Sequence, residues 1–599
     1  MIKKPELFSD DICFEILSHL ANDWKFIFTT CSLISQQWLN VIKHNSSLLN
    51  LSIYFNQKLN DEQKNQMSKC ELLTCLSNVK VYSKIAKWFC TNIGIFMKGM
   101  IRLEISYCRL EAEDVNFIGE MKQLTELDIS LNNINCKGAI TISQLSKLTK
   151  LNVYQTKMGV EGAKELSKLK ELTSLEIGDN HLKSEGAAHI AQMRKLTFLD
   201  INTNMIGNEG IELISRMEQL TDLDVMDNNI RSEGVKSLCK MKHLTNLNIG
   251  NNPIEDEGAI LLGEMKQLKN LITACNNIGM KGFSSLSTLL NLESLVILGL
   301  DGKSTDFIRE MNQLTRLEFY GSNLEPKGFD PISHLSNLTF LTIRGRNIAD
   351  GDLECIGQFK KLTTLNVPSC NINQGFKSIC GLKNLTFLDL SYNKIESVES
   401  ITNLKSLTQL DINGNRIGHE GAKSISQLDN LTNLQIGHNL IQDEGIKYLS
   451  TMQCLTTLGV AENQISIEGA KFISKSHQLT SLDLTNNVIE TEGAKILSEL
   501  NNLTGLFVYG NRIRDEGAKY ISTMQQLTIL DIAYNEITDE GAKAISNLDQ
   551  LSTLYIYSNE ICDEGAKSIC GMKQLTILDI DYNVLSEEVS NQLRMEYHN

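Results

Sequence analysis

The chain repeats one stretch with small changes, Leu527-Thr-Ile-Leu-Asp-Ile-Ala-Tyr-Asn-Glu-Ile-Thr-Asp-Glu-Gly-Ala-Lys-Ala-Ile-Ser-Asn-Leu-Asp-Gln550. This repetition determines the fold. The next copy begins at Leu551, so the period is 24 residues. A constant period in this range is typical of a solenoid, in which each repeat stacks only on its neighbours. A solenoid offers a long concave wall rather than a closed pocket, so we expect binding before catalysis.

The first half of the repeat predicts a short strand and a turn. Leu527, Leu530 and Ile532 are expected to point inward, and the last two alternate with Asp531 as in a half-buried strand. Asn535 follows the strand, and its side-chain amide can satisfy backbone groups of the turn. Stacked copies of this residue would form an asparagine ladder.

The second half of the repeat predicts a short helix. Asp539 stands where an N-cap residue belongs, and Gly541 lets the helix approach its neighbour closely. Ala542, Ile545 and Leu548 lie three apart and form an inward face. Other repeats also carry side chains that can cap a helix at the place of Asp539, namely Ser184, Ser232, Asp256, Asp443, Thr491, Asp515 and Asp563.

The repeats divide the chain into four predicted segments. Residues 1–46 form a small helical domain, and residues 47–99 form divergent repeats or a capping region. Residues 100–586 hold about twenty repeats of 22 to 24 residues, and residues 587–599 form a C-terminal cap. The predicted fold is an α/β solenoid with parallel strands on its concave face and short helices on its convex face.

The spacing of the repeats slips in the middle of the array. Leu292 and Leu314 are 22 residues apart, as are Leu385 and Leu407, and the Glu-Gly-Ala signal of the helix is missing there. The stretch 394–401 is therefore predicted to turn in a 3₁₀ or irregular segment. The asparagine column also changes, to Leu300, Ser322, Arg346 and Cys370. A change of curvature and simple drift of the repeat length both account for this pattern.

The first segment carries more apolar side chains than three short helices can bury. They are Leu7, Phe8, Ile12, Ile16, Leu17, Leu20 and Trp38. Residues 7–42 resemble the F-box, although Phe8 stands where that family has proline and Leu33-Ile34 stands where it has Val-Cys. The resemblance implies that these apolar side chains bind a Skp-type adaptor.

The repeats resemble the leucine-rich repeat through the core Leu-x-x-Leu-x-Leu-x-x-Asn. Their Glu-Gly-Ala-Lys helix is similar to the GALA subclass and, more distantly, to ribonuclease-inhibitor-like repeats. An F-box followed by leucine-rich repeats resembles the substrate-receptor subunit of an SCF-type ubiquitin ligase. This implies a non-catalytic subunit of a protein-degradation pathway, with a Skp adaptor, a cullin behind it, and a protein substrate on the concave face.

Two other functions stay open. The chain could be an intracellular protein-binding scaffold without a ligase, in which the first segment only caps the repeats. It could also assist an enzyme, as GTPase activators with similar repeats do, but those resemble longer repeats. A pull-down that tests for the adaptor and the cullin separates the ligase subunit from the scaffold.

Composition predicts a cytoplasmic protein, with the nucleus as a second possible location. The net charge of −15 argues against nucleic-acid and anionic-membrane binding. We expect no signal peptide and no membrane-spanning helix, because no long apolar run is present. The 15 cysteines form no Cys-x-x-Cys pair, and we expect reduced thiols, no metal site and no cofactor.

Two stretches of the predicted concave wall carry aromatic side chains, which are typical of binding hot spots. The first, near the C-terminus, is our predicted substrate site, with Phe507, Tyr509, Asp531, Tyr534, Tyr555, Tyr557, Asp579 and Tyr582, and with Ile529, Ile577 and Asp581 beside them. The second is the rival site in the middle, with Arg316, Tyr320, Phe340, Arg344, Phe387 and Tyr392. Strand aromatics also suit a pleated surface without any partner.

Overall fold

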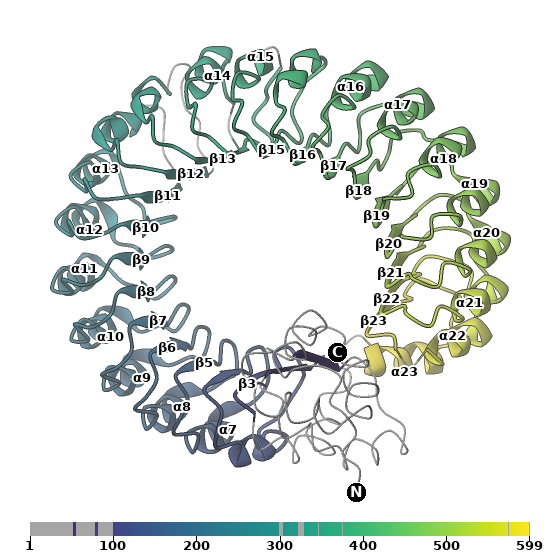
Figure 1. Ribbon diagram of the computed structural model, residues 1–599. Helices are drawn as coiled ribbons and strands as arrows, with labels where there is room; N and C mark the ends of the chain where they lie inside the picture. Colours follow the sequence, from purple (N-terminus) through teal and green to yellow (C-terminus); the bar gives the residue numbers. More distant parts are fainter. Residues whose placement is uncertain are drawn as a thin grey trace, which may run out of the picture. The chain divides into compact units, whose positions relative to one another are not determined.

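The computed structural model describes residues 52–55, 78–81, 100–298, 304–320, 329–345, 347–373, 375–572 and 574–597. The chain forms two compact units, one that ends at Gly282 and one that begins at Phe283. Each unit is a stack of repeats with its strands along one side and its helices along the other (Figure 1). The predicted solenoid of parallel strands and short helices is confirmed.

In the first unit every strand pairs in parallel with the next along the chain. Its strands are β1 (Ser52–Phe55), β2 (Asn78–Val81), β3 (Arg102–Glu104), β4 (Glu126–Asp128), β5 (Lys150–Asn152), β6 (Ser174–Glu176), β7 (Phe198–Asp200), β8 (Asp222–Asp224), β9 (Asn246–Asn248) and β10 (Asn270–Ile272). The helical elements are η5 (Asn116–Glu120), α7 (Asn135–Ile142), α8 (Gly159–Leu166), α9 (Lys183–Ile190), α10 (Gly207–Ile214), α11 (Ser232–Leu238) and α12 (Glu255–Leu262); α13 (Met280–Leu286) contains the division between the units.

The second unit has the same parallel pairing from its first strand to its last. Its strands are β11 (Ser294–Leu298), β12 (Arg316–Tyr320), β13 (Phe340–Arg344), β14 (Thr364–Asn366), β15 (Phe387–Asp389), β16 (Gln409–Asp411), β17 (Asn433–Gln435), β18 (Thr457–Gly459), β19 (Ser481–Asp483), β20 (Gly505–Phe507), β21 (Ile529–Asp531), β22 (Thr553–Tyr555) and β23 (Ile577–Asp579). Its helical elements are η6 (Ser304–Glu310), η7 (Asp330–His334), α14 (Asp350–Ile356), α15 (Phe376–Ile379), η8 (Glu399–Asn403), α16 (Gly418–Ile425), α17 (Gln442–Leu449), α18 (Ile467–Ile473), α19 (Glu490–Leu497), α20 (Arg514–Ile521), α21 (Asp539–Ile545), α22 (Asp563–Cys570) and α23 (Glu587–Tyr597).

The core of each repeat lies between its strand and its helix. In the repeat that begins at Leu527, Leu530 and Ile532 from the strand side and Ala542 and Ile545 from α21 are fully buried. Leu530 is in register with the equivalent leucines of β20 and β22. One strand and one short helix cannot bury such a core alone, so the stacking of neighbours supplies the stability of each repeat.

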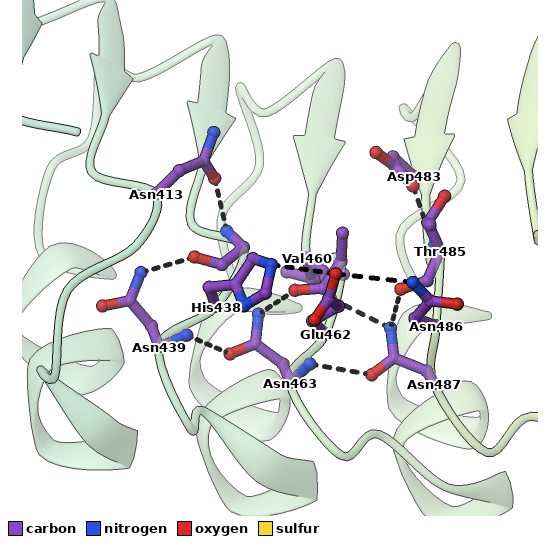
Figure 2. A network of polar contacts seen from close by, with 12 residues as sticks. Asn413, His438, Asn439, Val460, Glu462, Asn463, Asp483, Thr485, Asn486 and Asn487 are labelled. Atoms are coloured by element: carbon purple, nitrogen blue, oxygen red, sulfur yellow. Dashed lines mark hydrogen bonds and ion pairs between the residues drawn. The ribbon is translucent and has the colours of Figure 1, made fainter. Parts of the chain in front are cut away.

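The predicted asparagine ladder is confirmed, and Figure 2 shows three of its members side by side. The side-chain oxygen of Asn463 accepts a hydrogen bond from the backbone N–H of Asn439 in the preceding repeat at 3.0 Å. Its amide nitrogen donates to the carbonyls of Ile436 and Ala461 at 2.9 and 3.1 Å. Each asparagine therefore satisfies backbone groups of its own turn and of the preceding repeat.

The predicted role of Asp539 as the cap of its own helix is wrong. Thr538 takes that place, and its hydroxyl accepts a hydrogen bond from the backbone N–H of Glu540 at 3.4 Å. The Asp539 carboxylate instead accepts hydrogen bonds from Cys562 and Gly565 of the next repeat, at 2.8 and 2.9 Å. Stacking brings the N-terminus of α22 to this carboxylate, so the cap acts between repeats. The same contact to the next repeat is made by Asp256, Asp443, Asp515 and Asp563.

The cap between repeats explains the glycine of the Glu-Gly-Ala signal. A Cβ atom at Gly541 would lie 2.6 Å from a carboxylate oxygen of Asp515 and 2.7 Å from the Ile537 side chain. The same Asp515 oxygen accepts the Gly541 N–H at 2.9 Å. The predicted close approach at this glycine is therefore confirmed, and the atom that approaches is the cap of the preceding repeat.

The irregular middle also follows the prediction in part. The 3₁₀ helix η8 forms at Glu399–Asn403, and η6 lies between the two leucines of the other short spacing. Cys370 replaces the ladder asparagine, and its thiol points at the carbonyls of Ile343 and Pro368 at 3.3 Å each. These are the two carbonyl positions that the amide nitrogen uses elsewhere, so a weaker donor occupies the same place.

Of the two predicted terminal segments, the structure describes only the C-terminal one. The predicted adaptor-binding residues of the F-box-like segment lie outside the described residues, and so does its three-helix structure. At the other end the helix α23 occupies Glu587–Tyr597, where Leu593 is buried. Among the described residues, no helix has the length and apolar character needed to cross a membrane.

Candidate functional site

The predicted C-terminal site lies on the strands β20 to β23 and on the residues that directly follow them. The strand pairings align Phe507, Asp531, Tyr555 and Asp579 in one row across the wall. All four side chains are half-buried on the side of the strands that faces away from the helices. Acidic and aromatic side chains therefore alternate along the row, and Asp531 has an aromatic neighbour on each side.

A second row, two residues further along each repeat, brings tyrosines together. The ring centroids of Tyr509 and Tyr557 are 5.9 Å apart, with an angle of 38° between the rings. The repeat between them carries Ala533 at the equivalent position, and this alanine is fully buried. The small alanine leaves room for both rings to lean over it from either side.

Tyr534 extends this cluster towards solvent. Its ring stacks on Tyr509 with centroids 5.7 Å apart and an angle of 20°, yet the side chain stays 62% exposed. Tyr582 is 83% exposed, and no ring contact joins it to the cluster within the part of the chain that is described. Of the five tyrosines in the predicted site, ring contacts thus join Tyr509, Tyr534 and Tyr557.

The aromatic surroundings change the acidity of Asp531. Desolvation by burial raises its pKa from 3.8 to about 6, and the charges of Asp483 and Asp579 add to the rise. A hydrogen bond from the backbone N–H of Ala533, at 3.1 Å, acts in the opposite direction. The pKa of Tyr557 is raised as well, first by burial and then by the nearby Asp531 charge.

The carboxylates of this row are not neutralised within the wall. In the described parts of the chain no ion pair reaches Asp531 or Asp579, and the arginine at the start of α20, Arg514, pairs with Glu536 instead at 2.9 Å. Burial of a carboxylate without a cation is unfavourable, because the charge loses water and gains no partner. The row is therefore suited to accept a positive group from another molecule.

In the rival site on β12 and β13, one arginine is paired within the wall. The guanidinium of Arg316 lies 3.5 Å from the centre of the Phe340 ring, and its Nε donates to the Glu318 carboxylate at 2.8 Å. The Tyr320 hydroxyl donates to the other oxygen of the same carboxylate, and Arg344 lies 6.0 Å from the Tyr320 ring. Glu318 is only 7% exposed and links these groups, and it was not among the residues predicted from the sequence.

Two further aromatics that the sequence assigned to the rival site lie on and after β15. Phe387 is half-buried and Tyr392 is 63% exposed. The ring of Tyr392 covers Gly414 of the next repeat, since a Cβ there would lie 2.7 Å from a ring carbon. In the rival site Arg316, Glu318 and Tyr320 are therefore paired with one another, while Arg344 and Tyr392 are exposed.

The first unit carries acidic side chains on neighbouring strands. Glu176, Asp200 and Asp224 are in register on β6, β7 and β8. Burial is the main cause that raises the pKa of all three carboxyls, that of Asp224 to about 6. Among the residues that the structure describes, no group of His, Cys, Asp or Glu is arranged to hold a metal ion.

Comparisons with known proteins agree with the fold. A profile described as a leucine-rich repeat region matches residues 140–376 and 369–597, and a leucine-rich repeat profile matches residues 122–143. A search of curated proteins finds no match.

Several solved structures are similar to this chain. A leucine-rich repeat protein of Leptospira interrogans is 21% identical, with 86% of this chain and 97% of that chain covered and a TM-score of 0.37. An internalin of Listeria monocytogenes is 23% identical, with coverages of 61% and 88% and a TM-score of 0.38. The plant peptide hormone receptor RGFR1, in complex with RGF2, is 19% identical, with coverages of 82% and 91% and a TM-score of 0.38.

Proposed function

The chain belongs to the leucine-rich repeat family, and from this premise we propose that it binds a protein partner on the concave wall of β20 to β23. The leucine-rich repeat fold is typically a non-catalytic scaffold for protein binding, because its strands form an extended surface. The observation that carries the proposal is the cluster of Tyr509, Tyr534 and Tyr557 beside the unpaired carboxylate of Asp531.

The composition of this cluster is that of a protein-binding hot spot. Tyrosine offers a large contact area with few rotatable bonds, and its hydroxyl tolerates water before a partner arrives. Tyr509 and Tyr557 are half-buried and hold each other in place, so little side-chain entropy remains to be lost on binding. On the rival wall Arg316 already contacts Glu318 and Phe340, so this arginine is less available to a partner.

We further propose that the bound partner is the substrate of an SCF-type ubiquitin ligase, for which this chain is the receptor in the cytoplasm or nucleus. This finer assignment depends on the resemblance of residues 7–42 to the F-box. In that arrangement the first segment holds the Skp-type adaptor and through it the cullin, and the repeats hold the substrate. The alternative is a binding scaffold without a ligase.

Partner capture tests the wall. The full chain is crosslinked to its partner in cells, the partner is identified, and its affinity is measured for Tyr534→Ala combined with Tyr557→Ala. We expect a loss of at least roughly 2 kcal/mol, the scale of hot-spot residues. Tyr392→Ala is the matched control, since it removes an exposed tyrosine with the same left-handed backbone from the rival wall. If Tyr392→Ala reduces the affinity for the partner instead, the binding site lies in the rival site in the middle of the array.

Adaptor retention tests the ligase assignment separately. Ile16→Asp combined with Leu17→Asp should abolish co-purification of a Skp-type adaptor and of the cullin, because the charges disrupt the apolar surface that the F-box resemblance assigns to the contact. Thermal unfolding of the repeats should not change. Wild-type protein that never retains an adaptor, while it still captures its partner through the wall, would establish the scaffold alternative.

A further inference from the structure

The concave face of β21 lies between Phe507 of β20 and Tyr555 of β22, and we call this face with its two aromatic flanks the aromatic trough. Ile529 and Asp531 form its floor, and Ile529 is 37% exposed. On one side the Phe507 ring leans over Gly505, since a Cβ there would lie 3.6 Å from a ring carbon. On the other side Thr553, which has the same place relative to Tyr555, is only 9% exposed. The two aromatic residues thus flank a floor that is apolar at Ile529 and acidic at Asp531.

The trough is closed at the end beyond Asp531. Tyr509 and Tyr557 meet over Ala533, directly beyond Asp531 along the repeat. Phe507 and Tyr555 stand on strands two apart, so about 9.6 Å separates their backbones.

We propose that this trough receives an arginine side chain of the protein partner, with its guanidinium on Asp531 and between Phe507 and Tyr555. The inference rests on the proposed function, that this wall binds a protein, and specifies the chemistry of its central contact. The methylene stem of the arginine lies along Ile529, and the charged head reaches the carboxylate at the closed end.

Arginine fits this site better than lysine for physical reasons. Its guanidinium is planar, stacks on aromatic faces, and forms two parallel hydrogen bonds to one carboxylate. A lysine ammonium is compact and strongly hydrated, so it loses more by entering a trough whose walls exclude water. The negative charge of the floor, with Asp483 on β19 and Asp579 on β23 two strands away on either side, selects a cation over a neutral side chain.

The rival wall shows the same chemistry completed within the chain. There Arg316 lies on the ring of Phe340 and donates to Glu318, which occupies the place in its repeat that Asp531 has in its own. On β20 to β22 the aromatic ring and the carboxylate are present, and no arginine of the described residues pairs with the carboxylate. The partner supplies this missing component.

Short peptides test the proposal directly on the full-length protein. The probe is the acetylated, amidated peptide Gly-Gly-Arg-Gly-Gly, measured by calorimetry or NMR titration at low salt against versions with lysine, trimethyl-lysine or citrulline. Citrulline keeps the planar shape and loses the charge. We expect the arginine peptide to bind at least roughly tenfold more tightly than the citrulline peptide and several-fold more tightly than both lysine peptides.

Variants locate the contact. Asp531→Asn and Phe507→Leu should each reduce binding of the arginine peptide by at least roughly tenfold. Asp411→Asn is the matched control, because Asp411 has the same place in its repeat and a pKa raised to about 6, but its strand neighbours are Asp389 and Gln435. Thermal unfolding of each variant shows that the repeats remain folded.

Each other outcome overturns the inference. Equal binding of arginine and lysine peptides would show plain electrostatic attraction, and tighter binding of trimethyl-lysine would show a cage for quaternary ammonium. No binding of the arginine peptide, or an equal loss in Asp411→Asn, would also refute it. If partner capture still depends on Tyr534 and Tyr557 in that case, the proposed function stands and only the arginine assignment fails.

Discussion

Tyr509 and Tyr557 belong to repeats two apart, yet their ring centroids are only 5.9 Å from each other. Strands two apart in a sheet are about 9.6 Å from each other, so the rings must lean together. They can do so because Ala533, at the equivalent position between them, has no side chain beyond Cβ. The burial of Ala533 is the direct result of this closure.

Substitution Ala533→Leu should therefore wedge the two rings apart. We expect a loss of ~1–3 kcal/mol in the free energy of unfolding, as for other overpacked positions, and weaker partner capture. Ala461→Leu is the control, since this half-exposed alanine occupies the same position between Gly437 and Thr485. Chemical denaturation measures the free energy of unfolding of both variants. Equal losses for the two substitutions would show that the tyrosine pair plays no special role.

The asparagine ladder should be essential for stability. Asn535→Leu removes an acceptor for the backbone N–H groups of Asn511 and Ile513 and a donor to two carbonyls, all in buried surroundings. The unsatisfied groups should cost ~1–3 kcal/mol of unfolding free energy. Asn501→Leu, in an exposed turn, should change it by less than ~0.5 kcal/mol. A neutral result at Asn535 would refute the role of the ladder.

The cap that Asp515 provides to the helix of the next repeat should contribute to stability. The Asp515 carboxylate accepts hydrogen bonds from the backbone N–H groups of Thr538 and Gly541 at 2.8 and 2.9 Å and from the Thr538 hydroxyl at 2.7 Å. Asp515→Ala should cost ~1–2 kcal/mol, the range of strong N-caps, whereas Asp549→Ala in an exposed turn should be nearly neutral. Amide hydrogen exchange should localise the loss to α21 rather than α20; faster exchange in α20 alone would contradict a cap that acts on the next repeat.

The hydroxyl of Thr273, in the repeat that contains β10, should lower the stability of the core. The oxygen of Thr273 is buried and has no hydrogen-bond partner, at the position where other repeats carry isoleucine or valine. Thr273→Val should raise the unfolding free energy by roughly 1 kcal/mol, because it removes an unsatisfied polar group from the core. Thr273→Ser keeps the hydroxyl and should not stabilise. A destabilised valine variant would mean that the oxygen is satisfied in solution.

The raised pKa of Asp411 predicts an unusual pH dependence. Burial raises this pKa from 3.8 to about 6, so the folded protein holds a proton that the unfolded chain has already lost between these values. The cost of the buried charge is therefore fully present above pH 6 and disappears as the pH falls towards 3.8. Asp411→Asn should stabilise at pH 7, by no more than on the order of 2–3 kcal/mol, and should be nearly neutral near pH 4.

Asp563 should show the opposite pH dependence of stability from Asp411. Hydrogen bonds from the backbone and side chain of Ser586 lower its pKa, so its carboxylate contributes stability at neutral pH that is lost as the pH falls through the folded value. Asp563→Asn should therefore destabilise at pH 7 and have a smaller effect in acid. Thermal unfolding across the pH range measures both variants, and parallel curves for the two would contradict the assignment.

The repeat, the parallel strands with their short helices, and the buried core positions could all be predicted from the amino-acid sequence. This is because a period of 24 residues forces every copy of Leu530 and Ile532 into the same stacked environment. The asparagine ladder was predictable for the same reason, and the 3₁₀ turn at η8 was predictable because the spacing shortens to 22 residues and the Glu-Gly-Ala signal is missing there. The candidate site was predictable only as a set of aromatic and acidic positions on one wall.

Only the tertiary structure decided which of these residues meet. The stacking distance, together with the small Ala533, joins Tyr509 to Tyr557 and leaves Tyr582 apart. The same stacking turns Asp539 from the cap of its own helix into the cap of the next one. These contacts form between neighbouring repeats. Which residue a side chain contacts there depends on its orientation and on the offset between neighbouring helices. The sequence pattern of a single repeat contains neither of these two quantities.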